Sequence, residues 1–282
     1  MNNAITVENV SLRFAEKTIL NQVTFHVQEG EIFGLLGPSG AGKTTLIKIL
    51  TGQHRQDSGY AELLKKDTRK LGVREHEQIG TMMDSLGLYD RLSAYDNLLF
   101  YAEICHVGRS RITDLLKSIG LYESRRVAVS KLSKGMKNRL SLARALLNDA
   151  KILFLDEPAC GLDPATTQEI HRVLRRQREK GKTIFLTTHN MFEAQSLCDH
   201  VALLSKGSII EYGKPADICK KYNHTDELRM TLKDGKTLSL KNGSASALLM
   251  KELLEKEAIQ TIHSTEPTLE DVFIELTGRG LD

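Results

Sequence analysis

Residues 37–45, GPSGAGKTT, constrain what this chain can fold into more than any other stretch. They match the pattern G-x-x-x-x-G-K-S/T, in which a strand ends in a loop and the loop turns into a helix. The backbone N–H groups of such a loop form a nest for phosphate oxygens, and the helix dipole adds positive potential there. We expect Lys43 to reach the β- and γ-phosphates and the Thr44 hydroxyl to ligate Mg²⁺. The predicted phosphate-binding residues are consecutive: Gly37, Pro38, Ser39, Gly40, Ala41, Gly42, Lys43, Thr44 and Thr45.

The segments on either side of this loop have the required character. Glu31–Leu36 (EIFGLL) predicts a short buried strand, and apolar residues repeat at helical spacing over residues 46–50, before Gly52. A glycine-rich turn that fits the pattern by chance is the alternative, and the strand and helix patterns argue against it. The sequence therefore predicts a strand–loop–helix unit that binds a nucleoside triphosphate.

The composition is that of an ordinary globular protein, with 282 residues of which 40% are hydrophobic and 27% charged. This length favours one large domain plus a small appendage. No apolar run is long enough to span a bilayer and no signal peptide is evident, so we expect a cytoplasmic protein that does not cross a membrane by itself. The net charge of +3 is too small to indicate nucleic acid binding. The basic stretch Arg172–Arg178 predicts a solvated helix face rather than a phosphate-binding stripe.

The four cysteines stand far apart and include no C-x-x-C pair: Cys105, Cys160, Cys198 and Cys219. In a reducing compartment this spacing predicts free thiols that are buried. It does not indicate a metal site.

The first half of the chain divides into a strand-rich part and a helical part. Ile5–Val27 and Gln56–Lys66 carry strand patterns and predict a small antiparallel sheet beside the phosphate loop. Over about residues 84–147 the pattern is helical, with Ser93 and Asp96 forming a capping-box signature. This region predicts a helical subdomain inserted into an α/β body.

In the second half, strands alternate with helices, as in a parallel sheet with crossover helices. Ile152–Leu155 and Thr183–Thr187 are the apolar strands of this part, and the tail predicts a small α+β appendage with a hairpin turn at Asp234-Gly235. We therefore expect an α/β domain with a mixed, mainly parallel sheet over residues 1–215 and an α+β accessory region over residues 216–282.

Candidate catalytic residues follow two of these strands. The run ILFLDE ends in Asp156 and Glu157, at the edge where open parallel sheets bind ligands. We expect Asp156 to hold the Mg²⁺ shell, directly or through water, and Glu157 to act as general base on an attacking water. A solvated strand end is the alternative, and the preceding phosphate loop favours function. His189 follows the next strand; a lone histidine is more often structural, but this position predicts contact with the γ-phosphate.

The segment over residues 132–147, LSKGMKNRLSLARALL, contains a second helix start suited to anions. Ser133 is expected at the N-cap, with Gly135 following it. Because the helical region would hold this start away from residues 37–45, one chain would carry two half-sites. Two chains packed head to tail would then complete two nucleotide sites. A plain capped helix is the alternative, but it does not explain the full set of motifs in this order.

These motifs, in this order and spacing, resemble those of the nucleotide-binding subunit of an ATP-binding-cassette (ABC) transporter. GPSGAGKTT is similar to the family's Walker A motif, LSKGM to its signature motif and ILFLDEP to its Walker B motif. The resemblance implies that Asp163, in GLDP, lies in the D-loop and that His189 is the switch histidine. It also implies that Ser133 and Gly135 contact the γ-phosphate of ATP bound to the partner chain.

Other positions matter to the resemblance. Phe14 falls where the family has an aromatic residue that stacks on adenine. Lys134 and Met136 stand where the signature usually has glycine and glutamine. Asp84 stands where the family has a glutamine that contacts Mg²⁺ and water, so Asp84 is expected to ligate Mg²⁺ with a shorter reach and a negative charge.

The signature variant, the GLYDRL segment and the ending PTLEDVFIELTGRG resemble the branch that exports drugs, antibiotics and peptides in bacteria. The implied function is a subunit that binds and hydrolyses ATP with Mg²⁺ and powers a separate membrane-spanning permease. Such a subunit lies at the inner face of the cell membrane and pairs with a second nucleotide-binding subunit, as a homo- or heterodimer. Two alternatives stay open: a soluble ABC-type ATPase acting on ribosomes or DNA, and a regulatory subunit that binds ATP without hydrolysing it.

Overall fold

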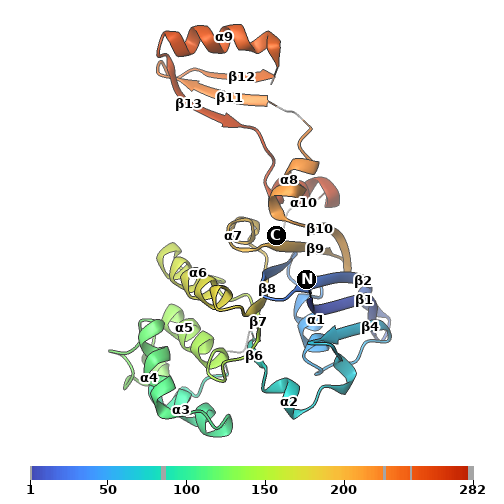
Figure 1. Ribbon diagram of the computed structural model, residues 1–282, viewed down its shortest axis with the longest axis vertical. Coiled ribbons are helices and arrows are strands. Elements are labelled where there is room, and N and C mark those ends of the chain that lie inside the picture. Colours follow the sequence, from blue (N-terminus) through green and yellow to red (C-terminus); the bar gives the residue numbers. More distant parts are fainter. Residues whose placement is uncertain (1, 84–86, 225–226, 242, 279–282) are drawn as a thin grey trace. The chain divides into compact units, whose positions relative to one another are not determined.

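The structure is a computed structural model that describes residues 2–83, 87–224, 227–241 and 243–278 (Figure 1). The chain divides into two compact units between Pro215 and Ala216. The assignment of residues 1–215 as the α/β domain and of residues 216–282 as the accessory region stays a prediction.

A six-stranded sheet forms the centre of the first unit, in the order β10-β9-β3-β8-β7-β6. Its strands are β3 (Ile32–Leu36), β6 (Ile79–Met82), β7 (Ile152–Asp156), β8 (Thr183–Thr188), β9 (His200–Ser205) and β10 (Ser208–Gly213). Every neighbouring pair is parallel except β9 with β10. The apolar runs of β3, β7 and β8 are completely buried, as central parallel strands require. This mixed, mainly parallel sheet confirms the predicted α/β class.

The strand-rich N-terminal part forms the expected antiparallel sheet, in the order β2-β1-β4-β5. The four strands are β1 (Asn3–Phe14), β2 (Lys17–Gln28), β4 (Ser58–Leu63) and β5 (Lys66–Asp67). Figure 1 shows β1, β2 and β4 grouped beside α1 (Lys43–Leu50), the helix that follows the phosphate loop.

Three helices make up the helical region between β6 and β7: α3 (Ala94–Ile104), α4 (Arg109–Ser118) and α5 (Lys134–Ala145). The other helices of the first unit are α2 (Val73–His76), α6 (Pro164–Glu179) and α7 (Met191–Leu197), with short 3₁₀ turns at Thr68–Lys70 and Val129–Lys131. Ser93 and Ser133 cap α3 and α5, each accepting a hydrogen bond from the backbone N–H three residues on. These caps confirm two helix starts that the sequence predicted.

The second unit combines a three-stranded antiparallel sheet, in the order β12-β11-β13, with helices. Its elements are α8 (Pro215–Lys221), β11 (Glu227–Leu232), β12 (Thr237–Lys241), α9 (Ser244–Glu255), β13 (Ile259–Ser264) and α10 (Leu269–Thr277). β11 and β12 pair on either side of the predicted turn at Asp234-Gly235. Among the helices of the described residues, none combines the length and the apolarity that a bilayer-spanning helix needs.

The structure corrects the expectation that all four cysteines are buried. Cys198 and Cys219 are buried free thiols as predicted, but Cys105 and Cys160 are exposed. Their spacing in the chain carries no information about which helix face or loop each one occupies. The sequence reading also missed α2, α8 and β6. β6 spans four residues, includes a glycine and, among the strands of the described residues, pairs only with β7.

Candidate functional site

Three parallel strands bring the phosphate loop, Asp156, Glu157 and His189 to one edge of the sheet. Leu36, the last residue of β3, lies opposite Thr188 of β8, and Asp156 of β7 lies opposite Thr187 of β8. The loops that follow these strands therefore meet, as loops do at the carboxyl edge of an open parallel sheet. They surround a cavity of about 400 Å³. Its lining residues are Ile19, Ser39, Gly40, Gly42, Lys43, Thr44, Thr45, Asp156, Glu157, Cys160 and His189.

The loop after β3 leaves the start of α1 open to an anion. Gly42 occupies the N-cap with φ of 112°. Because glycine has no side chain, no N-cap side chain accepts hydrogen bonds from the first N–H groups of α1. Lys43 curls back over the loop, and its Nζ donates to the carbonyl oxygens of Gly37 at 2.7 Å and Pro38 at 3.2 Å. This end of α1 has the N–H groups and the cation that a phosphate group needs.

Oxygen ligands for Mg²⁺ meet beside the loop. The Thr44 hydroxyl donates to Oδ2 of Asp156 at 2.7 Å, and the Thr187 hydroxyl donates to Oδ1 of the same carboxylate. Asp156 is only 3% exposed, and these two hydrogen bonds fix its orientation. A hydroxyl and a carboxylate are hard oxygen donors of the kind that Mg²⁺ prefers, so Thr44 and Asp156 fit the ion that the sequence predicted.

Glu157 turns its carboxylate into the cavity. Its backbone has φ of 51°, an uncommon conformation for a residue with a Cβ. Its N–H donates to the Thr187 hydroxyl at 3.1 Å, which holds this conformation in place. The carboxylate lies between two partners: Oε1 is 3.2 Å from Lys43 Nζ, and Oε2 is 2.9 Å from Nδ1 of His189. Lys43 of the phosphate loop, Glu157 and His189 thus form one connected cluster.

A buried network fixes the loop that carries His189. Glu193 of α7 accepts a hydrogen bond from the Thr188 hydroxyl at 3.0 Å and contacts His171 Nε2 of α6 at 2.8 Å. The Thr188 hydroxyl in turn accepts the Asn190 N–H at 3.0 Å. Since Glu193 is 6% exposed and His171 2%, water does not replace these contacts easily.

Replacing Glu193 with alanine is expected to lower the free energy of unfolding by about 3 kcal/mol, because His171 and Thr188 would lose a buried partner. Urea denaturation followed by circular dichroism measures the change. Glu179→Ala removes an exposed carboxylate at the end of α6, and this control should change the free energy by less than about 0.5 kcal/mol. Equal midpoints for the two variants would contradict a stabilising role of the network.

The signature residues and Asp163 lie at the starts of two helices. Ser133 caps α5, and its Oγ accepts the N–H of Met136 at 3.2 Å. Asp163 caps α6 by accepting the backbone N–H of Thr166, and this bond, together with one from the Thr166 hydroxyl, lowers the pKa of its carboxyl group. The two helix starts adjoin, since a Cβ built on Gly135 would lie 3.0 Å from Thr166 Cγ2. In the part of the chain that the structure describes, these residues do not line the cavity of the phosphate loop.

Phe14 and Asp84 are the two remaining site residues that the sequence predicted. Phe14 is 48% exposed, and its ring lies edge to face with His54 at 5.8 Å between centroids. Phe14 is not among the described residues that line the cavity, whereas Ile19 of β2 is. Asp84 lies outside the described residues. Sequence reasoning missed Ile19, Cys160 and Thr187 as parts of the site, because only the pairing of the strands brings them there.

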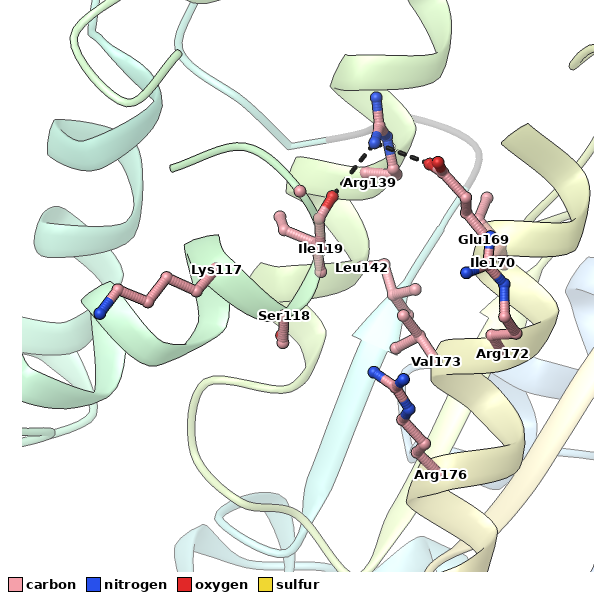
Figure 2. Close-up of a pocket in the computed structure, with 11 residues that line it drawn as sticks. Lys117, Ser118, Ile119, Arg139, Leu142, Glu169, Ile170, Arg172, Val173 and Arg176 are labelled. Carbon is pink, nitrogen blue, oxygen red and sulfur yellow. Dashed lines mark hydrogen bonds and ion pairs between the residues drawn. The ribbon is translucent and has the colours of Figure 1, made fainter. Parts of the chain in front are cut away.

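Another cavity, of about 210 Å³, lies between α4, α5 and α6. Figure 2 shows the side chains that line it. Arg139 of α5 donates through Nη1 to the carbonyl oxygen of Ile119 at 3.2 Å and pairs with Glu169 Oε2 of α6 at 2.7 Å. The pair connects the helical region to the helix that Asp163 caps. None of the described residues that line this cavity belongs to the predicted nucleotide site.

Comparison with known proteins places this geometry in a family. Residues 20–160 match the family described as ABC transporter, and residues 204–277 match the DrrA1-3-like ATP-binding protein C-terminal domain. A fluoroquinolones export ATP-binding protein of Mycobacterium tuberculosis is 38% identical, over 98% of this chain and 94% of that protein. The linearmycin resistance ATP-binding protein LnrL of Bacillus subtilis is 29% identical, over 98% of this chain and 99% of that protein.

A solved structure described as a dimeric, post-hydrolysis state of an ATP-binding cassette bound to ADP and Pi is also similar. It is 26% identical, with a TM-score of 0.66, and the match covers 74% of this chain and 98% of that one. The family match, the relatives and the similar solved structure all indicate an ATP-binding cassette. This agrees with the cluster of Lys43, Asp156, Glu157 and His189 at the edge of the sheet. The chain therefore belongs to the ABC transporter family.

Proposed function

We propose that this chain binds ATP with Mg²⁺, hydrolyses it, and thereby powers a separate membrane-spanning permease. The observation that carries the proposal is the position of the Glu157 carboxylate between Lys43 Nζ at 3.2 Å and His189 Nδ1 at 2.9 Å, on the wall of the phosphate-loop cavity. A phosphate-binding cation, a candidate base and a second polar group therefore converge on one space, which is what phosphoryl transfer to water requires.

Each residue has a distinct role in this proposal. The loop N–H groups and Lys43 bind the phosphates, and Lys43 would leave the carbonyl oxygens that it now contacts to do so. Thr44 and Asp156 would hold Mg²⁺, which when bound neutralises charge on the phosphates. Glu157 accepts a hydrogen bond from the attacking water and orients it for in-line attack. Because Glu157 accepts from Nδ1 of His189, Nε2 of that ring donates to the γ-phosphate in the imidazolium form, in which both nitrogens carry a proton.

A second chain completes each nucleotide site in this proposal. Ser133, Gly135 and Asp163 lie at adjoining helix starts, away from the lining of the chain's own described cavity. We propose that Ser133 and Gly135 contact ATP held by residues 37–45 of a partner, with Asp163 at the interface. The dimeric form of the related cassette bound to ADP and Pi supports this arrangement.

The proposed cargo is a drug, antibiotic or peptide that leaves the cell. Two relatives match nearly the whole chain: one is described as a fluoroquinolones export protein and the other as a linearmycin resistance protein. In this proposal the cassette spans residues 1–215, and residues 216–282 form an accessory region of the DrrA-like type. The chain would lie on the cytoplasmic side of the membrane, held there by the permease.

The test of this function is ATP hydrolysis by the purified full chain, followed by affinity capture from its own host. Hydrolysis that requires Mg²⁺, together with co-purification of a multi-span membrane protein, is the expected result. ATP binding without hydrolysis by the isolated chain or its complex would favour the regulatory alternative. Capture of ribosomes in place of a membrane protein would contradict the transport role.

Asp84 provides a separate prediction about the metal. If Asp84 takes part in the Mg²⁺ shell, Asp84→Gln should keep the fold and shift the Mg²⁺ concentration that gives half-maximal hydrolysis, because a neutral amide binds Mg²⁺ more weakly than a carboxylate. Titration of Mg²⁺ at fixed ATP measures the shift, with circular dichroism as the control for folding. Superimposable titrations of the two proteins would contradict a role for Asp84 in the metal shell.

A further inference from the structure

A thiol lies beside the proposed catalytic pair. A carboxylate oxygen of Glu157, the Sγ of Cys160 and a ring nitrogen of His189 all lie within 4.8 Å of one another. The first two residues follow β7 in a tight turn, in which the Cys160 N–H donates to the carbonyl oxygen of Glu157 at 3.2 Å. His189 follows β8, which pairs with β7. Sheet register and a turn therefore bring three side chains of metal-ligand type to one wall of the cavity.

The chemistry of this trio differs from that of the predicted Mg²⁺ ligands. Thr44 and Asp156 offer hard oxygen donors, which suit Mg²⁺. A thiolate, an imidazole and a carboxylate are the ligands of Zn²⁺, which binds soft and borderline donors. One cavity thus holds two donor sets that select different divalent cations.

The dimensions of the trio suit a tetrahedral ion. Zn–N and Zn–O distances of about 2.0–2.1 Å and Zn–S distances of about 2.3 Å place ligand atoms roughly 3.3–3.7 Å apart. Glu157 Oε2 and His189 Nδ1 are 2.9 Å apart, and the widest separation in the trio is within 4.8 Å. Changes of about 1 Å or less are then enough, and Cys160 and His189 are exposed side chains that can rotate.

The positive charge of Lys43 acts against the ion, and the negative charges of the Glu157 carboxylate and a Cys160 thiolate act in its favour. Lys43 Nζ, 3.2 Å from Glu157 Oε1, is the nearby cation, and it already donates to the carbonyl oxygens of Gly37 and Pro38. Lys43 therefore keeps two partners when the Glu157 carboxylate turns to a metal. The fourth position of the ion would face the cavity and take a water.

We propose that Glu157, Cys160 and His189 form a Zn²⁺ site, and that Zn²⁺ bound there blocks ATP hydrolysis. Coordination would occupy the carboxylate that is proposed to orient water and the histidine that is proposed to contact the γ-phosphate. The inhibition rests on the proposed ATPase function, whereas the binding of Zn²⁺ does not. Cys160 is the selective element, since it is the member of the trio with no part in that hydrolysis.

Metal binding is tested on the full chain without a histidine tag and without nucleotide. Co²⁺ serves as a coloured probe that Zn²⁺ then displaces, and a sulfur-to-cobalt charge-transfer band reports thiolate coordination. The band is expected in the wild type and in Cys105→Ser, a control at the other exposed cysteine, and it should be absent in Cys160→Ser. Zn²⁺ affinity should fall by at least about tenfold in Cys160→Ser, since loss of even an outer partner of a metal site costs that much. The same band and affinity in Cys160→Ser would overturn the site.

Inhibition is tested by titrating Zn²⁺ into ATP hydrolysis at saturating Mg²⁺, with each protein's rate divided by its own rate without Zn²⁺. Cys160→Ser should need at least about tenfold more Zn²⁺ for half inhibition than the wild type and Cys105→Ser. Equal inhibition of all three proteins would overturn the inhibitory role. If none of them hydrolyses ATP without Zn²⁺, the proposed ATPase function fails, and the Co²⁺ and Zn²⁺ binding result alone decides the site.

Discussion

Glu157→Gln is expected to lower ATP turnover by about a hundredfold or more while ATP binding stays close to that of the wild type. The amide has nearly the size of the carboxylate but cannot take a proton from water. It also loses the ion pair with Lys43, which in the wild type is 3.2 Å away, so Lys43 becomes freer to bind phosphate. Turnover at saturating ATP and Mg²⁺ measures the first effect, and titration with a fluorescent ATP analogue measures the second.

The matched control is Glu169→Gln. Glu169 is also a glutamate paired with a basic side chain, Arg139, but it lies on α6 beside the cavity of Figure 2. This variant should keep wild-type turnover. If Glu157→Gln also kept it, Glu157 would not be the base, and the water would need another acceptor in the cavity.

Gly37→Ala is expected to destabilise the fold by about 3 kcal/mol or more and to abolish ATP binding. A Cβ built on Gly37 would lie 2.2 Å from the carbonyl oxygen of Leu204 in β9. Since that oxygen belongs to the backbone of a buried strand, no side-chain rotation removes the clash. The loop must shift away from β9 and carry with it the carbonyl that Lys43 contacts. Urea denaturation and ATP titration measure the two effects.

Gly40→Ala, in the same loop, separates steric clash from backbone strain. A Cβ on Gly40 would meet no atom within 4 Å, although φ of 78° is costly for alanine. This variant should lose about 1 kcal/mol of stability. A similar small loss in Gly37→Ala would mean that the loop tolerates movement against β9.

Several parts of this site could be predicted because their causes are local. The order of Gly42, Lys43 and Thr44 after an apolar strand is enough to predict a phosphate loop, since the helix start itself supplies the N–H groups. Ser133 and Asp163 could be predicted as helix caps because each bonds a backbone N–H only three residues away. Alternating apolar runs likewise predict which segments are strands.

Other parts depend on contacts between residues far apart in the chain. The position of Glu157 between Lys43 and His189 requires β3, β8 and β7 to be neighbours in parallel register, and local pattern does not specify strand order. The same order places Cys160 against His189, which the spacing of the cysteines did not suggest.

The sequence by itself therefore determined which residues can bind phosphate, cap a helix or serve as a base, because these capacities follow from residue type and near neighbours. The tertiary structure alone decided which of them meet. Three features depend on contacts between distant parts of the chain: the exposure of Cys160, the packing of Phe14 on His54 and the clash that excludes a side chain at Gly37. They arise when the sheet brings distant segments to within a few ångströms, a distance that chain spacing does not encode.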